Sequence, residues 1–209
     1  MVVDSDVEFV RPFTAETFVR DGRVRFFCKR NEIGRRFSRH MTWHRVAREL
    51  LGLPPAEPPY PDYISPSIAW DPAIVRRMLA QVAATTDRPP LTAIAGQLDF
   101  SECVLHGVFV DEVMGAQANS FVSDDPLCRA YWGPAPLNVD SAAHFIRAVQ
   151  PTDIAVAISS KSRTPLAVRE EIFSTLRATG PWLQVRKVNE SSARECSRTG
   201  LVKMKSGAE

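Results

Sequence analysis

The chain has 209 residues, 44% of them hydrophobic and 24% charged, so it can bury a core of ordinary size as one domain or as one domain with an appendage. No apolar run approaches the roughly 18–20 residues that a membrane helix needs, and the acidic start MVVDSDVEFV lacks the apolar stretch of a secretory signal. These features exclude a membrane-spanning class and predict a soluble, intracellular, cytoplasmic protein. The four widely spaced cysteines are then expected to be free thiols.

The charge is distributed unevenly along the chain. Residues 20–48 hold ten Arg or Lys and two acidic residues, and residues 186–205 hold six and two. Because the whole chain is only +2, the remainder carries a net charge of −10. Such asymmetry is informative about binding partners rather than about the fold.

Near the start of the chain, residues 7–10 predict a short strand, and strict alternation predicts a second strand over residues 22–29. One face of the second strand is apolar. The other face is expected to be open and consists of Arg23, Arg25, Phe27 and Lys29. A helix follows over 38–51, capped by Ser38 or Thr42 and ended by Gly52, with Arg45 and Arg48 off its apolar stripe.

Six prolines among residues 53–67 mark the best boundary in the sequence, because each ring restricts its own backbone and that of its predecessor. We therefore predict four parts. These are a basic strand–helix module (1–53), a proline-rich linker (54–67), an α/β core (68–188) and a flexible basic tail (189–209).

Within the core, Asp71 as cap and Pro72 at the first position predict a helix that ends before the DRPP sequence at 87–90. Apolar runs predict strands at 91–95 and 103–110, and residues 111–138 are expected to be loop. A helix over 141–149 precedes a strand at 153–159, a helix at 165–179 and a strand at 182–188. The last three form a βαβ-like unit, so the expected fold class is α/β or α+β.

The basic segment favours a nucleic-acid partner, DNA or RNA, whose phosphates its cations would neutralise, while Phe27 stacks on a base. The predicted contacts are Arg23, Arg25, Phe27, Lys29, Arg30, Arg35, Arg36, Arg39 and Arg45. Two alternatives remain open. One is a solvated face in a protein from an arginine-rich proteome, and the other is a site for an anionic membrane surface. His40 and His44 share a helix face and are interpreted as further phosphate donors rather than as a metal site; Cys103 and His106 are another loose pair.

A second candidate site precedes the helix at 165–179, where a helix N-terminus attracts anions. It consists of Ser159, Ser160, Lys161, Ser162, Arg163 and Thr164. The stretch TDIAVAISSKSRTPLAVREEI resembles the second strand–loop–helix of sugar isomerase (SIS) domains over about thirty residues, and in that family the loop holds a sugar phosphate. Lys161 and Ser162 replace the family's Ser-Gly, and we do not assign the chain to the family. The alternative function implied is a phosphate-ligand enzyme or sensor.

Other readings of the sequence involve metal-dependent hydrolysis or protein assembly. A nuclease would use Lys161 with Asp153 and one of Glu170 and Glu171, which diverge by about 100° on a helix. A structural or assembly protein, viral among the possibilities, would offer the Pro–Tyr segment between Pro58 and Tyr63 to a protein partner. No P-loop, GxSxG, HExxH or GxGxxG motif is present, so we expect a non-catalytic role with no cofactor and no metal.

Overall fold

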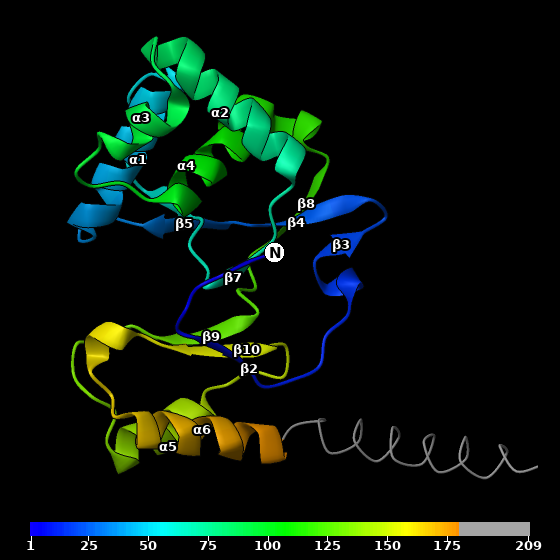
Figure 1. The fold of residues 1–209 in the computed structure, drawn as a ribbon, viewed down its shortest axis with the longest axis vertical. Coiled ribbons are helices and arrows are strands. Elements are labelled where there is room, and N and C mark those ends of the chain that lie inside the picture. Colours follow the sequence, from blue (N-terminus) through cyan, green and yellow to red (C-terminus); the bar gives the residue numbers. More distant parts are fainter. Residues whose placement is uncertain (180–209) are drawn as a thin grey trace, which may run out of the picture.

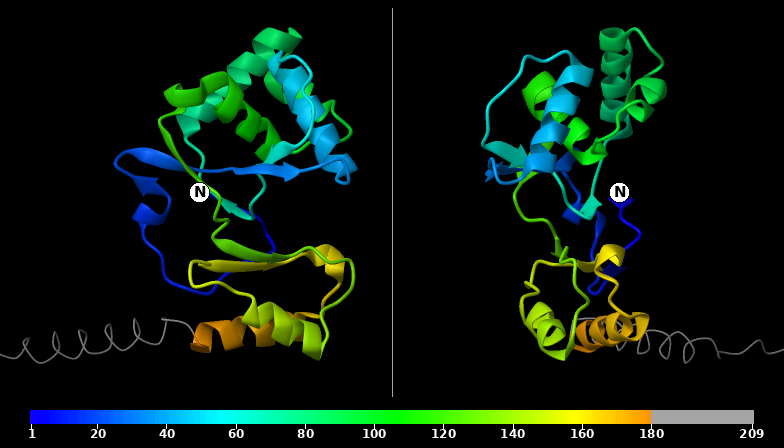
Figure 2. Two further views of the ribbon diagram at one scale, coloured as in Figure 1. Left: turned by 180° about the vertical axis from the view of Figure 1, so that it is seen from behind. Right: turned by 90° about the vertical axis from the view of Figure 1, so that its left-hand side faces the viewer.

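Two groups of helices cover small sheets at opposite ends of the molecule (Figure 1). The computed structural model describes residues 1–179, and the predicted fold class is confirmed as mixed α+β. We call the end formed by α1 to α4 the helical lobe, and the end formed by β2, β9, β10, α5 and α6 the sheet lobe. Views from behind and from the side show the same separation (Figure 2).

The helical lobe packs four helices above two small sheets. The helices are α1 (Ser38–Leu51), α2 (Pro72–Thr86), α3 (Pro90–Ala95) and α4 (Glu102–Val108), and α4 continues into a π-helical turn at Phe109–Met114. One sheet has the order β3 (Val19–Arg20), β4 (Arg23–Phe27) and β8 (Ser120–Ser123), with β4 and β8 parallel. The other pairs β5 (Lys29–Ile33) with β6 (Tyr60–Asp62).

The sheet lobe has the strand order β2 (Val7–Phe9), β10 (Ala155–Ile158) and β9 (Cys128–Tyr131). Strands β9 and β10 are parallel and joined through α5 (Val139–Arg147), which is a βαβ unit. Helix α6 (Leu166–Thr179) lies beside α5 on the same face of the sheet (Figure 1). Strands β1 (Val2–Val3) and β7 (Ser67–Ile68) pair between the lobes. Short 3-10 turns occur at Ala15–Thr17, Gly115–Ala118 and Ser160–Ser162.

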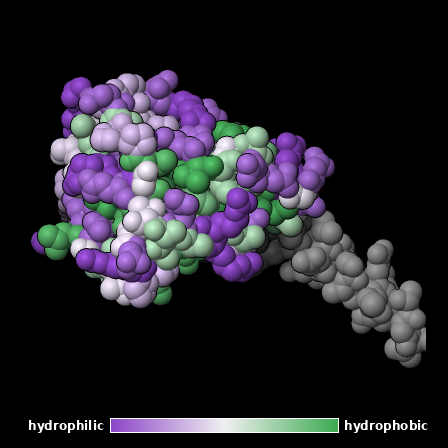
Figure 3. All heavy atoms as spheres, turned by 90° about the horizontal axis from the view of Figure 1, so that it is seen from above, coloured by the Kyte–Doolittle hydropathy of each residue, from purple (hydrophilic) through white to green (hydrophobic). Residues whose placement is uncertain are grey.

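Each lobe has its own buried hydrophobic residues. In the helical lobe one cluster runs from Phe26 to Ala118 and includes Leu51 and Tyr63, so the packing continues across the proline-rich segment. In the sheet lobe β10 is buried on both faces. Val156 and Ile158 face α5 and α6, while Ala155 and Ala157 pack with Phe18 and Leu127. From above, hydrophilic residues cover most of the visible surface, with hydrophobic residues between them (Figure 3).

Several predicted elements are confirmed. The helix at 38–51 has the predicted bounds and ends at Gly52, whose φ of 72° is the left-handed conformation that glycine adopts without strain. Its predicted cap by Ser38 or Thr42 is wrong, because Phe37 holds the cap position and no side chain caps the helix. The predicted cap of α2 is also present, since the Asp71 carboxylate accepts a hydrogen bond from the Ala73 N–H at 2.7 Å. The strands at 7–10 and 153–159 and the helices at 141–149 and 165–179 correspond to β2, β10, α5 and α6.

Other predicted elements are wrong. The apolar runs at 91–95 and 103–110 are not strands but lie mostly in α3 and α4. Ser101 caps the start of α4, since its hydroxyl accepts from the Val104 N–H. The prediction failed because short apolar runs have too little periodicity to separate strand from helix. Residues 111–138 are not a loop, because they contain β8 and β9. The predicted strand at 182–188 and tail at 189–209 lie outside the described residues.

Among residues 1–179, none of the helices combines the length and the apolar character that crossing a membrane requires.

Candidate nucleic-acid interface

The basic segment forms β4, β5, the turn before α1 and α1 itself, and many of its cations are paired with acids from elsewhere in the chain. Arg30 donates to both carboxylate oxygens of Asp111, at 2.7 Å for the Nη2–Oδ1 pair. Asp99 accepts from Arg39 at 3.0 Å. Much of the positive charge seen in the sequence is therefore balanced locally by residues distant in the chain.

Arg48 is one of the cations that the structure buries. It is 7% exposed, and it donates to the Pro54 carbonyl at 2.6 Å and to Glu112 at 2.5 Å. A position off the apolar stripe predicts a side chain that faces water or a partner, and for Arg48 this prediction is wrong. The contact holds α1 against the start of the proline-rich segment and the π-helical turn.

Arg25 and Phe27 do not lie on an open strand face, and that prediction is also wrong. Both side chains are buried, with relative exposures of 8% for Arg25 and 9% for Phe27. The Arg25 guanidinium donates to the Ser123 hydroxyl at 2.6 Å and to the Asp125 carbonyl at 2.7 Å. Burial lowers the pKa of Arg25 below its ordinary value. These contacts make Arg25 a structural residue. The Phe27 ring is buried, so it is not available to stack on a base.

The remaining predicted contacts are exposed, and most of them have an acidic neighbour. Within the described residues these pairs are Arg23 with Asp21 (4.0 Å), Lys29 with Glu32 (3.4 Å), Arg35 with Glu57 (3.0 Å) and Arg45 with Glu49 (2.7 Å). Arg36 lies over the ring of Phe37, 4.7 Å from its centroid. Exposed ion pairs of this kind contribute about 0–1 kcal/mol each, so a phosphate can displace the carboxylate at small cost.

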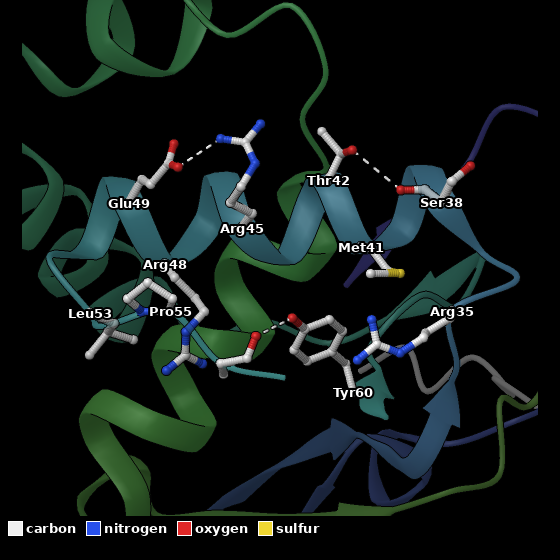
Figure 4. A pocket seen from close by; sticks show the side chains of 11 residues that line it. Arg35, Ser38, Met41, Thr42, Arg45, Arg48, Glu49, Leu53, Pro55 and Tyr60 are labelled. Atoms are coloured by element: carbon white, nitrogen blue, oxygen red, sulfur yellow. Dashed lines mark hydrogen bonds and ion pairs between the residues drawn. The ribbon is translucent and has the colours of Figure 1, made fainter. Parts of the chain in front are cut away.

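A groove of about 580 Å³ runs between α1 and the proline-rich segment (Figure 4). Arg35 and Arg48 flank Tyr60 in this view, and Arg45 projects from the other side of α1. Apolar groups of Met41, Leu53, Pro55 and Ala56 complete much of the lining, with Ser38, Thr42 and Glu49. The lining residues thus include three arginines and one glutamate. Sequence reasoning missed this groove because its two walls come from segments that were assigned to different parts of the chain.

The second predicted site, residues 159–164, uses many of its polar groups within the chain. The Ser160 N–H donates to the Asp6 carboxylate at 2.7 Å, and the Thr164 hydroxyl accepts from the Leu137 N–H at 3.0 Å. Ser162 is fully buried, with its hydroxyl 2.8 Å from that of Thr164. A carboxylate of the chain already contacts the loop where an external anion was expected, whereas the side chains of Lys161 and Arg163 are exposed.

The carboxylates proposed for a nuclease lie in different surroundings. Asp153 is buried, and its carboxylate accepts from the Gln150 N–H at 2.6 Å. Glu170 and Glu171 are exposed on α6. Within residues 1–179 there is no cluster of three or more His, Cys, Asp or Glu side chains suited to a metal ion.

Two histidines of the helical lobe, His44 and His106, are buried packing groups. His44 is 1% exposed and stacks on Tyr60, with 4.5 Å between ring centroids, and its Nε2 lies 3.0 Å from the Pro61 carbonyl. Burial lowers the pKa of His44 and of His106 to about 4. Both rings are therefore neutral at pH 7, and His44 does not add a positive charge for phosphate.

The segment between Pro58 and Tyr63 is also integrated into the fold. Tyr60 belongs to β6 and is 9% exposed, while Tyr63 is 3% exposed and donates its hydroxyl to Asp111 at 2.7 Å. The two tyrosine rings are consequently packed inside the chain and are not available to a protein partner.

Compared with known protein families, curated proteins and solved structures, the chain matches none.

Proposed function

We propose that the protein binds nucleic acid, and that the exposed arginines at the start of α1 and along it contact the phosphates. The proposed contacts are Arg35, Arg36, Arg39 and Arg45. The observation that carries the proposal is that these four side chains are exposed on one turn and the helix that follows it, and that Arg35 and Arg45 line the groove. Arg25 and Arg48 of the same segment are instead buried in internal contacts.

The exposure of these pairs supports the proposal. The Arg35 side chain is 76% exposed and that of its partner Glu57 is 83% exposed, so the pair is screened by water and salt. A phosphate brings a full negative charge and releases condensed counterions when it binds, which is the main source of affinity in sequence-independent binding. Exchange of a screened carboxylate for a phosphate is therefore favourable at low salt.

The test compares two charge-matched triple variants. In the first, Arg35, Arg36 and Arg39 are replaced by Gln. In the control, three exposed cations elsewhere in the helical lobe, Arg76, Arg77 and Arg88, are replaced by Gln, which changes the net charge by the same amount. Binding of a fluorescent DNA or RNA oligonucleotide is measured by anisotropy over a salt titration.

Four phosphate contacts in the wild type predict a slope of log K against log[salt] of roughly −2.8 to −3.6, from about 0.7–0.9 per phosphate. The first triple variant should lower the magnitude of this slope by roughly 2–3, and the control should leave it nearly unchanged. Absence of binding by the wild type at low salt, or an equal loss in both variants, would contradict the proposal.

A further inference from the structure

Planar side chains form a stacked series at the start of α1. Arg36 lies over Phe37 at 4.7 Å, Phe37 stacks on His40 at 5.7 Å, and His40 stacks on Trp43 at 4.7 Å. Arg39 lies over the other end of the series, 5.4 Å from the centroid of the Trp43 ring. The three rings are only partly buried, so this edge of α1 combines π faces with two of the proposed phosphate contacts.

Trp43, the last ring of this series, also lines a second cavity, of about 530 Å³. The cavity lies where β1 and β7 pair between the two lobes, and its wall includes Phe100, Trp132 and Lys161. Trp132 is 58% exposed, which is a large apolar surface for a water-facing position. Lys161 belongs to the candidate anion site at residues 159–164, so the fold brings a residue of that loop to the same cavity as Trp43 of α1.

The chemistry of the lining matches a nucleobase with its phosphate. Indole and phenyl rings stack on bases, and ammonium and guanidinium groups contact phosphate. The carboxylates of Asp4 and Glu102 also line the cavity and can accept hydrogen bonds from the amino groups of bases. The volume falls within the range of about 300–1,000 Å³ that is usual for small-molecule sites.

We infer that this cavity holds an unpaired base of a single strand, stacked against Trp132, while Lys161 and Arg39 contact the adjoining phosphates. This inference rests on the proposed function and narrows its substrate class to single-stranded nucleic acid. A base inside a duplex is stacked and paired on both sides and cannot enter such a cavity unless it leaves the stack.

The experiment uses one mixed-sequence DNA oligonucleotide, both as a single strand and annealed to its complement. Wild-type protein should bind the single strand more tightly, and the intrinsic tryptophan fluorescence should be quenched on binding. Trp132→Ala should weaken single-strand binding by about tenfold or more, since a stacked base contributes strongly to affinity, and should leave duplex binding unchanged. Because the Trp132 side chain is exposed, the Trp132→Ala variant should have the far-UV circular dichroism spectrum and the melting temperature of the wild type.

A matched control is Leu91→Ala on α3, which removes another exposed apolar side chain (70% exposed) away from the cavity and should change neither affinity. Lys161→Gln should weaken single-strand binding and reduce its salt slope by about one phosphate. Equal binding of both forms with no effect of Trp132→Ala would overturn this inference and leave the proposed function standing. Failure of the wild type to bind either form would refute both.

Discussion

Asp111 lies in the π-helical turn after α4 and connects it to Arg30 of β5 and to Tyr63, and its removal tests how much these contacts stabilise the fold. The carboxylate accepts from the Arg30 guanidinium and from the Tyr63 hydroxyl, at 2.7 Å for the latter. The two donors lie in different surroundings. The Arg30 side chain is 54% exposed, whereas Tyr63 is 3% exposed.

This difference sets the expected cost of Asp111→Ala. The exposed Arg30 guanidinium is hydrated once the carboxylate is removed, so loss of this ion pair lowers the free energy of unfolding by about 1 kcal/mol or less. The Tyr63 hydroxyl is left buried without its acceptor, which costs about 1–3 kcal/mol. We therefore expect the free energy of unfolding to fall by about 2–3 kcal/mol, with a drop in Tm of roughly 2–4 °C for each kcal/mol in a chain of this size.

Urea unfolding followed by far-UV circular dichroism measures this loss. In a Tyr63→Phe background the hydroxyl is already absent, so adding Asp111→Ala should then cost only about 1 kcal/mol or less. Glu57→Ala is the control, because it removes the exposed partner of Arg35 and should change stability by less than about 0.5 kcal/mol. An Asp111→Ala variant as stable as Glu57→Ala, or one that loses the same free energy of unfolding in both backgrounds, would contradict this prediction.

Two further predictions concern packing and pH. Gly107→Ala would place a Cβ 2.1 Å from the Cγ of Tyr63, so we expect the free energy of unfolding in urea to fall by about 1–3 kcal/mol. Gly34→Ala is the control, and it should be nearly neutral because there is open space around the new methyl group. Because burial lowers the pKa of His44 and His106 to about 4, the unfolded state binds protons that the folded state does not between pH 6.5 and 4. The free energy of unfolding should therefore decrease as the pH falls from 6.5 towards 4, by on the order of 2–3 kcal/mol for each histidine. A urea midpoint that is as high at pH 4.5 as at pH 7 would contradict this.

The sequence by itself determined those elements whose signals are local. Helix α1 follows from a 3.6-residue apolar stripe and from Gly52, and α2 follows from Asp71 and Pro72. Capping and periodicity act over a few residues, so they can be recognised without knowing what the helix packs against. The short runs that became α3 and α4 lack this information, because an apolar run of five to eight residues is compatible with a helix or a strand.

The sequence also determined that the cations are concentrated in residues 20–48, but only the tertiary structure decided which of them are exposed. Arg25 meets Ser123, Arg30 meets Asp111 and Arg48 meets Glu112, each across more than 60 residues of chain. A strand pattern shows which residues share a face, and it does not show whether another segment covers that face.

The loop at 159–164 illustrates the same limit. Its Ser and Thr residues and the helix after it were visible in the sequence. The carboxylate of Asp6, in the turn just before β2, nevertheless accepts from the Ser160 N–H that an anion would otherwise approach. Lys161 instead reaches a cavity shared with Trp43, from a helix in the other lobe. Trp43 and Lys161 line one cavity because the two lobes lie on either side of the paired strands β1 and β7. No local sequence pattern specifies that arrangement.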